Sequence, residues 1–371
     1  MKIFTLLVCV AATVFLAGCK TGDNQNRPMT LKAAFKNDFL IGAAINRSQF
    51  FEEDQRGVPI IKAQFNSISP ENVLKWESVH PQPDQYDFAG PDRYVQFGES
   101  NNMYIIGHTL VWHSQTPRWV FQDEHGNPAT RDFLLARLHD HIATVVGHFK
   151  GHIKGWDVVN EALNEDGSLR NSQWRKIIGD DYIEKAFQFA HEADPQAQLH
   201  YNDYGLENES KRKGAIALIQ KLQGEGIPIN CIGLQDHVKM DWPTAKQLDE
   251  TISDFAKLGV KVMITELDVD VVPRTQRNHS ADVAANAQPT AGADTFANGL
   301  PEAKQSELAQ RYGELFHVYV KHRADISRVT FWGVTDGDSW LNSPGRVNYP
   351  LLFDRAGQPK PAFQAILDEA K

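Results

Sequence analysis

The stretch GWDVVNEAL, residues 155–163, predicts a buried strand that ends on a carboxylate. Val158 and Val159 are β-branched residues that favour a strand, and the polar residues Asn160 and Glu161 close the run. A carboxylate beside bulky apolar neighbours is partly desolvated, which raises its pKa and suits it to acid or base chemistry. The stretch therefore predicts a strand that delivers a glutamate to a functional site.

Seven further segments also read as strands, and helix-compatible segments with apolar residues at helical spacing separate several of them. With residues 154–161 the predicted strands are residues 39–46, 67–71, 103–112, 198–202, 231–237, 261–268 and 328–335. The predicted helices include residues 131–149, 181–193, 211–224, 245–258 and 302–321, and a last one starts at Pro361. Eight strands alternating with helices predict an α/β fold, a single (β/α)8 TIM barrel. A doubly wound sheet is the alternative, and the strand count and chain length favour closure.

Length, charge and cysteine content limit the function. A chain of 371 residues fits one barrel with insertions. The net charge of −9 argues against nucleic acid as a partner, because proteins that bind it concentrate Lys and Arg against the phosphates. Of the three cysteines only Cys231 lies beyond the N-terminal segment, so neither an internal disulfide nor a cysteine metal cluster is expected in the folded body.

The N-terminus has the features of an export signal. Residues 1–18 combine a charged start, a short apolar run and small residues, which indicates a signal peptide. The sequence LAGC, residues 16–19, resembles the bacterial lipobox, in which cleavage leaves Cys19 as a lipid-bearing first residue. We therefore expect an exported lipoprotein anchored to a membrane, at the cell surface or on a periplasmic face, with residues 19–29 as a polar tether and residues 30–371 as the catalytic domain. An ordinary signal peptide with a chance cysteine is the alternative.

One long segment lacks periodicity. Residues 274–300 are rich in Ala, Asn, Thr and Gln, and follow the seventh predicted strand. In a barrel such a loop lies on the catalytic face. Two interpretations stay open: the loop borders the substrate cleft, or it is a surface loop without a role in binding.

Polar and aromatic residues gather at the carboxyl ends of the predicted strands, which converge on one mouth of a barrel. They are Glu71, Asn72, Lys75, His108, Trp112, His113, Gln115, Asn160, Glu161, Asn202, Tyr204, Gln235, His237, Glu266, Asp268, Trp332 and Trp340. Glu266 lies in the stretch VMITELD, residues 262–268, so a second apolar run delivers a second glutamate. Glycoside hydrolysis is the reaction that most directly requires two carboxylates on either side of one bond.

At this point the sequence resembles the family 10 glycoside hydrolases, the retaining endo-1,4-β-xylanases. Six motifs match in order, and together they cover most of residues 31–371. They are SPENVLKW at 69–76, GHTLVWH at 107–113, WDVVNE at 156–161, GLQDH at 233–237, ITELD at 264–268 and FWGVTD at 331–336.

The resemblance implies a role for each matching residue. Glu161 is the acid/base and Glu266 the nucleophile, His237 and Asp268 orient the nucleophile, and Asn160 contacts the sugar 2-hydroxyl. Tyr204 is expected toward the aglycone side. The glycone-side residues implied are Glu71, Asn72, Lys75, His108, Trp112, Gln115, Gln235, Trp332 and Trp340.

The same resemblance implies a monomeric enzyme that acts on xylan and xylo-oligosaccharides without cofactor or metal. Two features depart from the family pattern. LNSPG, residues 341–345, stands after Trp340 where many members have arginine, and the loop after strand seven is longer. A related retaining β-1,4-glucanase or aryl-glycosidase is the main alternative. A sugar-binding lipoprotein without activity, and a metal-dependent barrel hydrolase using His108, His237 and Asp268, are the others.

Overall fold

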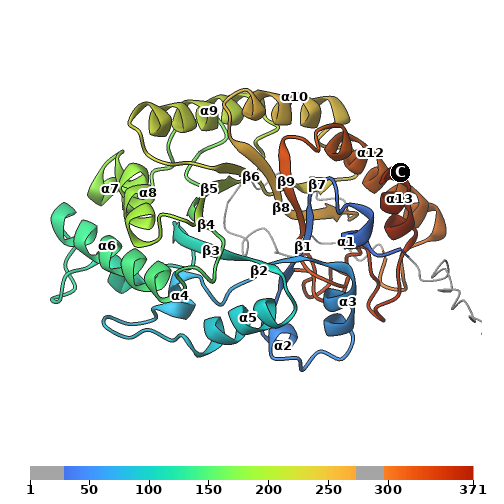
Figure 1. Ribbon diagram of the computed structural model, residues 1–371, viewed down its shortest axis with the longest axis horizontal. Helices are drawn as coiled ribbons and strands as arrows, with labels where there is room; N and C mark the ends of the chain where they lie inside the picture. Colours follow the sequence, from blue (N-terminus) through green and yellow to red (C-terminus); the bar gives the residue numbers. More distant parts are fainter. Residues whose placement is uncertain (1–28, 273–295, 371) are drawn as a thin grey trace, which may run out of the picture.

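The computed structural model describes residues 29–272 and 296–370, which form a parallel barrel enclosed by helices (Figure 1). The strands are β1 Leu40–Ile45, β2 Ser67–Pro70, β3 Tyr104–Trp112, β4 Gly155–Asn160, β5 Gln198–Asp203, β6 Cys231–Leu234, β7 His237–Lys239, β8 Lys261–Asp270 and β9 Ile326–Phe331. Their hydrogen-bonded order is β6-β5-β4-β3-β2-β1-β9-β8-β7, and a further pairing of β6 with β8 closes the ring. The predicted single (β/α)8 barrel is therefore confirmed.

Helices surround the strands on the outside of the barrel, and one short 3₁₀ helix, η1, follows β3 (Figure 1). The larger helices are α3 Gly57–Gln64, α5 Ala89–Ser100, α6 Arg131–His148, α8 Tyr182–Ala193, α9 Glu209–Gly224, α10 Ala245–Ala256, α12 Glu302–Lys321 and α13 Pro361–Glu369. The shorter ones are α1 Leu31–Ala34, α2 Arg47–Phe50, α4 Trp76–Val79, η1 Arg118–Phe121 and α7 Gln173–Ile178. Helices α1 and α12 lie side by side, with the rings of Phe35 and Phe316 at a centroid separation of 5.3 Å.

Local sequence explains how these helices start and where they face. Helix α10 begins at a capping box in which Thr244 accepts from the backbone of Gln247 and the Gln247 side chain reaches back. Its buried residues Leu248, Ile252 and Phe255 recur at spacings of four and three, so one stripe of the helix packs on the barrel. The same period underlies the other predicted helices.

Three details of the strand prediction are wrong. The predicted strand at residues 231–237 is divided into β6 and β7, because Asp236 takes a left-handed backbone with φ of 54° between them. The last barrel strand is β9, Ile326–Phe331, so Trp332 follows the strand instead of lying within it. Glu266 lies inside β8, which continues to Asp270, because residues after Glu266 pair with β7 as well as with β9.

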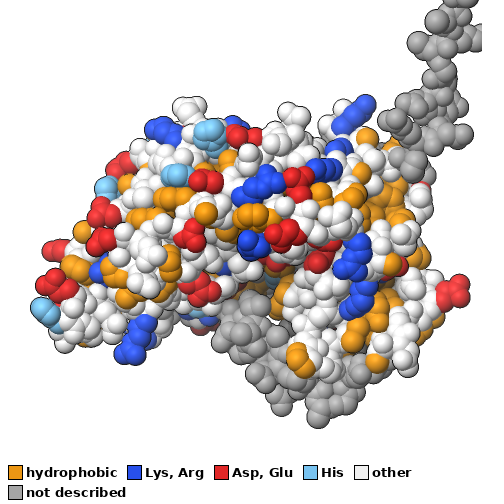
Figure 2. All heavy atoms as spheres, turned by 90° about the horizontal axis from the view of Figure 1, so that it is seen from below, with side chains coloured by type: hydrophobic (Ala, Val, Ile, Leu, Met, Phe, Trp, Pro, Cys, Tyr) orange, Lys and Arg blue, Asp and Glu red, His pale blue; other side chains and the backbone are white. Residues whose placement is uncertain are grey.

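Several sequence predictions fall outside the described residues. They are the signal peptide, the lipidation of Cys19, most of the tether and residues 274–295 of the long loop. None of the helices that the structure describes has the length and apolar character needed to cross a membrane. On the face of the molecule drawn in Figure 2, Lys and Arg side chains lie among Asp and Glu side chains.

Candidate active site

An open cleft of about 1250 Å³ crosses the carboxyl end of the barrel. All fifteen residues to which the sequence analysis gave a catalytic or substrate-binding role lie on its wall. They come from the ends of seven of the eight barrel strands and from the loops that follow them, so the barrel itself brings them together. The described end of the long loop also reaches this cleft through Phe296.

Glu161 is fixed at the centre of the cleft, one residue beyond β4. Its backbone is left-handed, with φ of 56°, and its N–H donates to the carbonyl of Asn202 at 2.9 Å. Its side chain is buried and accepts hydrogen bonds from the Trp112 indole at 2.9 Å, from the Gln235 amide at 3.0 Å and from the Asn160 amide at 3.5 Å. Both carboxylate oxygens therefore have a defined orientation.

The surroundings of Glu161 favour its neutral form. Burial raises its pKa to about 7, and the negative charges of Asp203 and Glu266 act in the same direction. The hydrogen bonds from Gln235 and Trp112 lower the pKa and only partly offset the increase. A carboxyl group of this kind holds a proton up to neutral pH and can donate it there.

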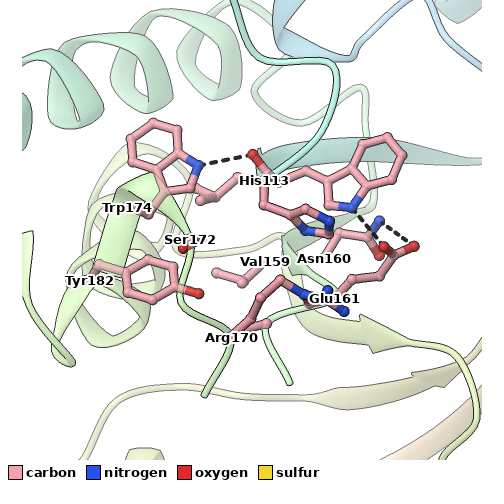
Figure 3. Close-up of a pocket in the computed structure, with 11 residues that line it drawn as sticks. His113, Val159, Asn160, Glu161, Arg170, Ser172, Trp174 and Tyr182 are labelled. Carbon is pink, nitrogen blue, oxygen red and sulfur yellow. Dashed lines mark hydrogen bonds between the residues drawn. The ribbon is translucent and has the colours of Figure 1, made fainter. Parts of the chain in front are cut away.

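Packing behind Glu161 excludes water from that side. His113, Arg170, Trp174 and Tyr182 converge around a hollow next to Glu161 that is too small to hold a water molecule (Figure 3). Trp174 donates its indole N–H to the carbonyl of Trp112 at 2.9 Å, so the tryptophan that binds Glu161 is itself held in place. The Glu161 carboxyl group therefore faces the cleft on one side and tightly packed side chains, with no room for water, on the other.

Glu266 faces the same cleft from β8 and has the opposite electrostatic setting. It accepts hydrogen bonds from His237 Nε2 at 3.1 Å and from Asn202 Nδ2 at 2.8 Å. Burial by itself raises the pKa of Glu266, but the hydrogen bond and charge of His237, with help from His108 and Asn202, bring it below the ordinary value. Glu266 is therefore ionised at pH values at which Glu161 holds its proton.

His237 is a cation at neutral pH. Burial lowers its pKa, but the charge of Asp268, whose Oδ2 lies 3.1 Å from Nδ1, and that of Glu266 raise it to about 10. Asp268 is itself oriented by the indole N–H of Trp340, which donates at 2.7 Å. Trp340, Asp268, His237 and Glu266 thus form one continuous chain across the cleft floor.

Two amide side chains join the two glutamates. Asn202 donates through the same Nδ2 to Glu266 and to Asn160 Oδ1, at 2.8 and 2.9 Å. Gln235 donates to Asn160 at 3.3 Å and to Glu161 at 3.0 Å. Asn202 was predicted at the rim of the barrel without a catalytic or binding role, although it lies at a strand end like the residues for which a role was predicted.

A second histidine, His108, acts on Glu266 through its charge. His108 contacts Asp157 at 2.9 Å, and the far oxygen of Asp157 lies 3.2 Å from His200. Both histidines are buried, and the close approach of His200 requires glycine at position 155, where a Cβ atom would lie 2.5 Å from the imidazole. All three side chains are buried, and the charge of His108 is one of the causes that lower the pKa of Glu266.

One end of the cleft is formed by the loops after β2, β3 and β9. Lys75 donates to Asn72 at 3.0 Å and to Gln115 at 2.8 Å, and lies 5.0 Å from the ring centroid of Trp112. Burial and the nearby Asp338 raise the pKa of Glu71 to about 7. This end therefore offers a cation together with several donors and acceptors for hydroxyl groups.

The opposite end contains residues that the sequence analysis missed. The turn after β7 brings Lys239 and Trp242 to the cleft, and the Lys239 N–H donates to the Trp242 carbonyl at 2.7 Å. Arg311 on α12 bonds the carbonyls of Lys239 and Pro243 and thereby fixes the turn. Because β7 itself was not predicted, no sequence signal placed these residues. The cleft is also lined by Glu165, Asn208, Glu209, Met240, Asp241, Gln247 and Lys304.

The unusual segment after Trp340 supports the wall of the cleft. Arg346 is buried there, and it donates to the carbonyl of Leu341 and to Asp270 Oδ1, both at 2.5 Å. Asn348 donates to the same oxygen of Asp270 at 2.6 Å. Asp270 lines the cleft, so this segment fixes the end of β8.

The three side chains proposed as metal ligands, His108, His237 and Asp268, make other contacts. His108 pairs with Asp157, and His237 lies between Glu266 and Asp268. Within the described part of the chain, no three His, Cys, Asp or Glu side chains are arranged to hold a metal ion. The arrangement that the cleft does contain is one protonated and one ionised carboxyl group, which suits general acid and nucleophilic chemistry on one bond.

Comparisons with known proteins agree with this geometry. The family model described as Glycosyl hydrolase family 10 matches residues 30–369. Endo-1,4-beta-xylanase A of Xylanibacter ruminicola is 42% identical over 346 residues, which are 92% of this chain and 94% of that protein. Beta-1,4-xylanase of Dictyoglomus thermophilum is 43% identical over 367 residues, 98% of this chain and 97% of that protein.

Solved structures give the same result. A GH10 endoxylanase retrieved from a sugarcane soil metagenome superposes with a TM-score of 0.87 at 42% identity, covering 92% of this chain and 99% of that one. Among the relatives is also an exoglucanase of Acetivibrio thermocellus, 41% identical over 94% of this chain but over only 30% of that protein.

Proposed function

Because the chain belongs to glycosyl hydrolase family 10, it is an endo-1,4-β-xylanase, and we propose that Glu161 and Glu266 are its acid/base and its nucleophile. The enzyme cleaves internal β-1,4-xylosidic bonds of xylan and xylo-oligosaccharides. The observation that supports the two roles best is the opposite setting of two buried glutamates, one with a raised pKa and one with a lowered pKa. In this proposal cleavage proceeds with retention of configuration, through two displacements at the anomeric carbon.

Glycosylation is the first displacement. The Glu266 carboxylate attacks the anomeric carbon, the bond from that carbon to the leaving oxygen breaks, and Glu161 gives its proton to that oxygen. His237 and Asn202 hold Glu266 ionised and aimed before the reaction starts, so little reorganisation is needed. The products are a glycosyl ester on Glu266 and a shortened xylan chain.

Deglycosylation is the second displacement. Glu161, now ionised, takes a proton from water, the water oxygen attacks the anomeric carbon, and the ester bond to Glu266 breaks. Because the two attacks come from opposite faces, the product has the configuration of the substrate. Asn160 would contact the sugar 2-hydroxyl in both steps, since its amide is fixed by Asn202 and Gln235 beside both glutamates.

Substrate binding is proposed for both ends of the cleft. The glycone side would use Glu71, Asn72, Lys75, His108, Trp112, Gln115, Gln235, Trp332 and Trp340, and Tyr204 would contact the aglycone side. Polar groups fix the sugar hydroxyls, and tryptophan faces stack on the rings. Trp332 and Trp340 both lie against His237, with ring centroids 6.3 and 4.9 Å away, so they stand next to the reacting sugar.

Selectivity for xylose over glucose follows from this position of the tryptophans. Glucose carries a hydroxymethyl group that xylose lacks, and a tight tryptophan wall excludes it. A glucanase activity is the second candidate, because one relative is named an exoglucanase. Rates on xylan and on cellulose at equal concentration distinguish the two: faster turnover of xylan supports the xylanase, and faster turnover of cellulose supports the alternative.

We also propose that the enzyme is an exported lipoprotein held at a membrane through Cys19, as the lipobox-like sequence indicates. The C19A variant should then partition into the aqueous phase of a detergent extract, whereas the wild type enters the detergent phase. We propose that the catalytic domain is monomeric, because Met29 and Phe133 are the large hydrophobic side chains exposed among the described residues. Sedimentation of the domain without residues 1–28 tests this directly.

Substitution of the two glutamates tests the proposed roles. Glu266→Ala should abolish turnover of every substrate, because no nucleophile remains. Glu161→Ala should spare aryl glycosides whose leaving groups need no proton, and azide should restore turnover by attacking the accumulated ester. Equal losses in Glu161→Ala on activated and unactivated substrates would mean that Glu161 is not the acid.

A further inference from the structure

Asp203, the last residue of β5, is a carboxylate with no exposed surface. Three donors bind it: the Tyr201 hydroxyl at 2.5 Å, the Tyr204 N–H at 2.9 Å and the Lys211 ammonium at 3.0 Å. Burial raises the pKa of Asp203, and Lys211 and Tyr201 oppose that effect. The pKa of Asp203 stays above its ordinary value, while the ammonium ion and the two further donors on its oxygens favour its ionised form.

The same residue is connected to the backbone of the acid/base. The Tyr201 hydroxyl, which donates to Asp203, accepts a hydrogen bond from the N–H of Ala162 at 3.0 Å. Ala162 directly follows Glu161, whose left-handed backbone turns its side chain toward the cleft. Asp203 therefore fixes the rotamer of the tyrosine that holds the strand end carrying Glu161.

Asp203 also acts on Glu161 as a charge. After burial, it is the largest cause of the raised pKa of Glu161, ahead of Glu266. Lys75, Arg170 and Tyr204 also act on Glu161, and His113 lines the hollow next to it. Lys75 and Arg170 are cations, so among these neighbours only Asp203 and Glu266 favour the proton on Glu161.

Asp203 faces groups from every element around it. Lys211 comes from α9, Tyr182 from α8, Arg170 from the loop after β4, and Tyr201 from β5 itself. Arg170 donates to the backbone carbonyl of Glu161 at 3.0 Å, and its charge lowers the pKa of Asp203. These neighbours partly offset the negative charge of Asp203, and their own charges stay the same throughout the reaction.

We propose that Asp203 is a positioning residue for the acid/base, whose fixed negative charge holds a proton on Glu161 in the free enzyme and still faces Glu161 in the glycosyl-enzyme. This inference rests on the proposed roles of Glu161 and Glu266. Glu266 loses its charge when it becomes an ester, so its repulsion of Glu161 disappears in mid-reaction. Asp203 keeps its charge and makes Glu161 a stronger base when it takes the proton of the attacking water.

The Asp203→Asn variant tests the charge, because asparagine has nearly the same size. The basic limb of the kcat/KM profile on xylotetraose should shift down by about one pH unit, the change expected when one nearby like charge is removed. Deglycosylation, followed with an activated aryl xylobioside for which it limits the rate, should also slow, because Glu161 becomes a weaker base. A purely structural role would lower rates without moving the basic limb.

Asp194→Asn is the matched control. Asp194 is equally buried, accepts the N–H groups of Gly151 and Gln196 at 3.1 and 3.0 Å, and precedes the opposite end of β5. The basic limb of the kcat/KM profile of Asp194→Asn should lie at the same pH as that of the wild type. An unmoved limb in folded Asp203→Asn overturns the inference, while the proposed function stands if azide still rescues Glu161→Ala. If azide does not rescue that variant, the proposed function itself fails.

A measurement on the wild type avoids any dependence on folding of the variant. With ¹³C at the aspartate carboxyl carbons, NMR should show Asp203 ionised throughout the range in which Glu161 titrates. The Asp203 signal should also show an inflection at the pKa of Glu161, because coupling between two sites is reciprocal. A protonated Asp203 at neutral pH overturns the inference.

Discussion

The indole N–H of Trp112 donates a 2.9 Å hydrogen bond to Oε2 of Glu161. This contact joins the last residue of β3 to the proposed acid/base, which follows the neighbouring strand β4. It stabilises the ionised form of Glu161 and lowers its pKa. The effect is opposite in sign to that of Asp203, so the protonation of Glu161 depends on a balance between the two.

Trp112→Phe should remove the hydrogen bond and keep most of the ring. Because the bond favours the carboxylate, its loss should move the basic limb of kcat/KM to higher pH, while kcat falls roughly tenfold, the effect of losing a hydrogen bond to a charged group. The measurement is a pH profile on xylotetraose. Trp119→Phe is the control, since Trp119 donates to Pro81 and contacts neither glutamate. A limb that moves to lower pH would contradict this sign.

His237→Gln should weaken the nucleophile. His237 is charged, with a pKa near 10, and it helps to lower the pKa of Glu266, so its removal raises that pKa. A group with a raised pKa ionises at higher pH, and the acidic limb of kcat/KM should therefore shift up, by about one pH unit. His148→Gln, which breaks an exposed contact to Asp92, should leave that limb unchanged. An unmoved acidic limb in His237→Gln would show that His237 does not set the charge of Glu266.

Asn160→Ala should slow the reaction only where the substrate has a 2-hydroxyl group. Hydrogen bonds to this hydroxyl strengthen in the transition state, so kcat/KM on an aryl xylobioside should fall by about 100-fold or more, as for other groups that bind developing charge. On the matching 2-deoxy substrate, the variant and the wild type should react at similar rates. Equal losses on both substrates would mean that Asn160 acts by supporting Glu161 and Asn202.

A buried histidine pair predicts how stability depends on pH. His80 and His141 face each other through Nδ1 atoms 3.1 Å apart, and the His141 ring stacks on Trp76. Burial, helped by Arg137, lowers the pKa of His80 to about 4, and burial puts the pKa of His141 far below its usual value.

In the unfolded chain both histidines gain protons below a pH of about 6.5. The unfolded state therefore binds more protons than the folded state between about pH 6.5 and pH 4, and stability falls as the pH is lowered through this range. Thermal unfolding should show Tm dropping over that range, and His141→Phe should flatten the drop. A wild-type Tm that is constant between those pH values would contradict this account.

Much of the site could be predicted from the chain because barrel strands are apolar runs with polar ends. Asn160, Glu161 and Gln235 follow this rule, and each lies where the strand count placed it. Glu266 lies on the strand predicted for it, but that strand continues two residues further than predicted, to Asp270, where it pairs with β7. That pairing follows the left-handed backbone at Asp236, for which the sequence offered no signal.

Other features depend on contacts between distant segments. Asp203 acquires its role from Tyr201, Lys211 and the strand end at Ala162, which come from different elements. His80 and His141 are 61 residues apart and meet only because α6 packs beside the loop after α4. Neither set forms a periodic pattern along the chain, so periodicity could not reveal it.

The stereochemistry of hydrolysis tests the central claim, a nucleophilic Glu266 paired with the acid/base Glu161. ¹H NMR of the anomeric protons during the first minutes of xylohexaose hydrolysis reports the configuration of the product before it mutarotates. A retaining double displacement predicts that the β-anomer appears first and that the α-anomer grows in later. An α-anomer that appears first would mean direct attack by water, and Glu266 would then not be the nucleophile.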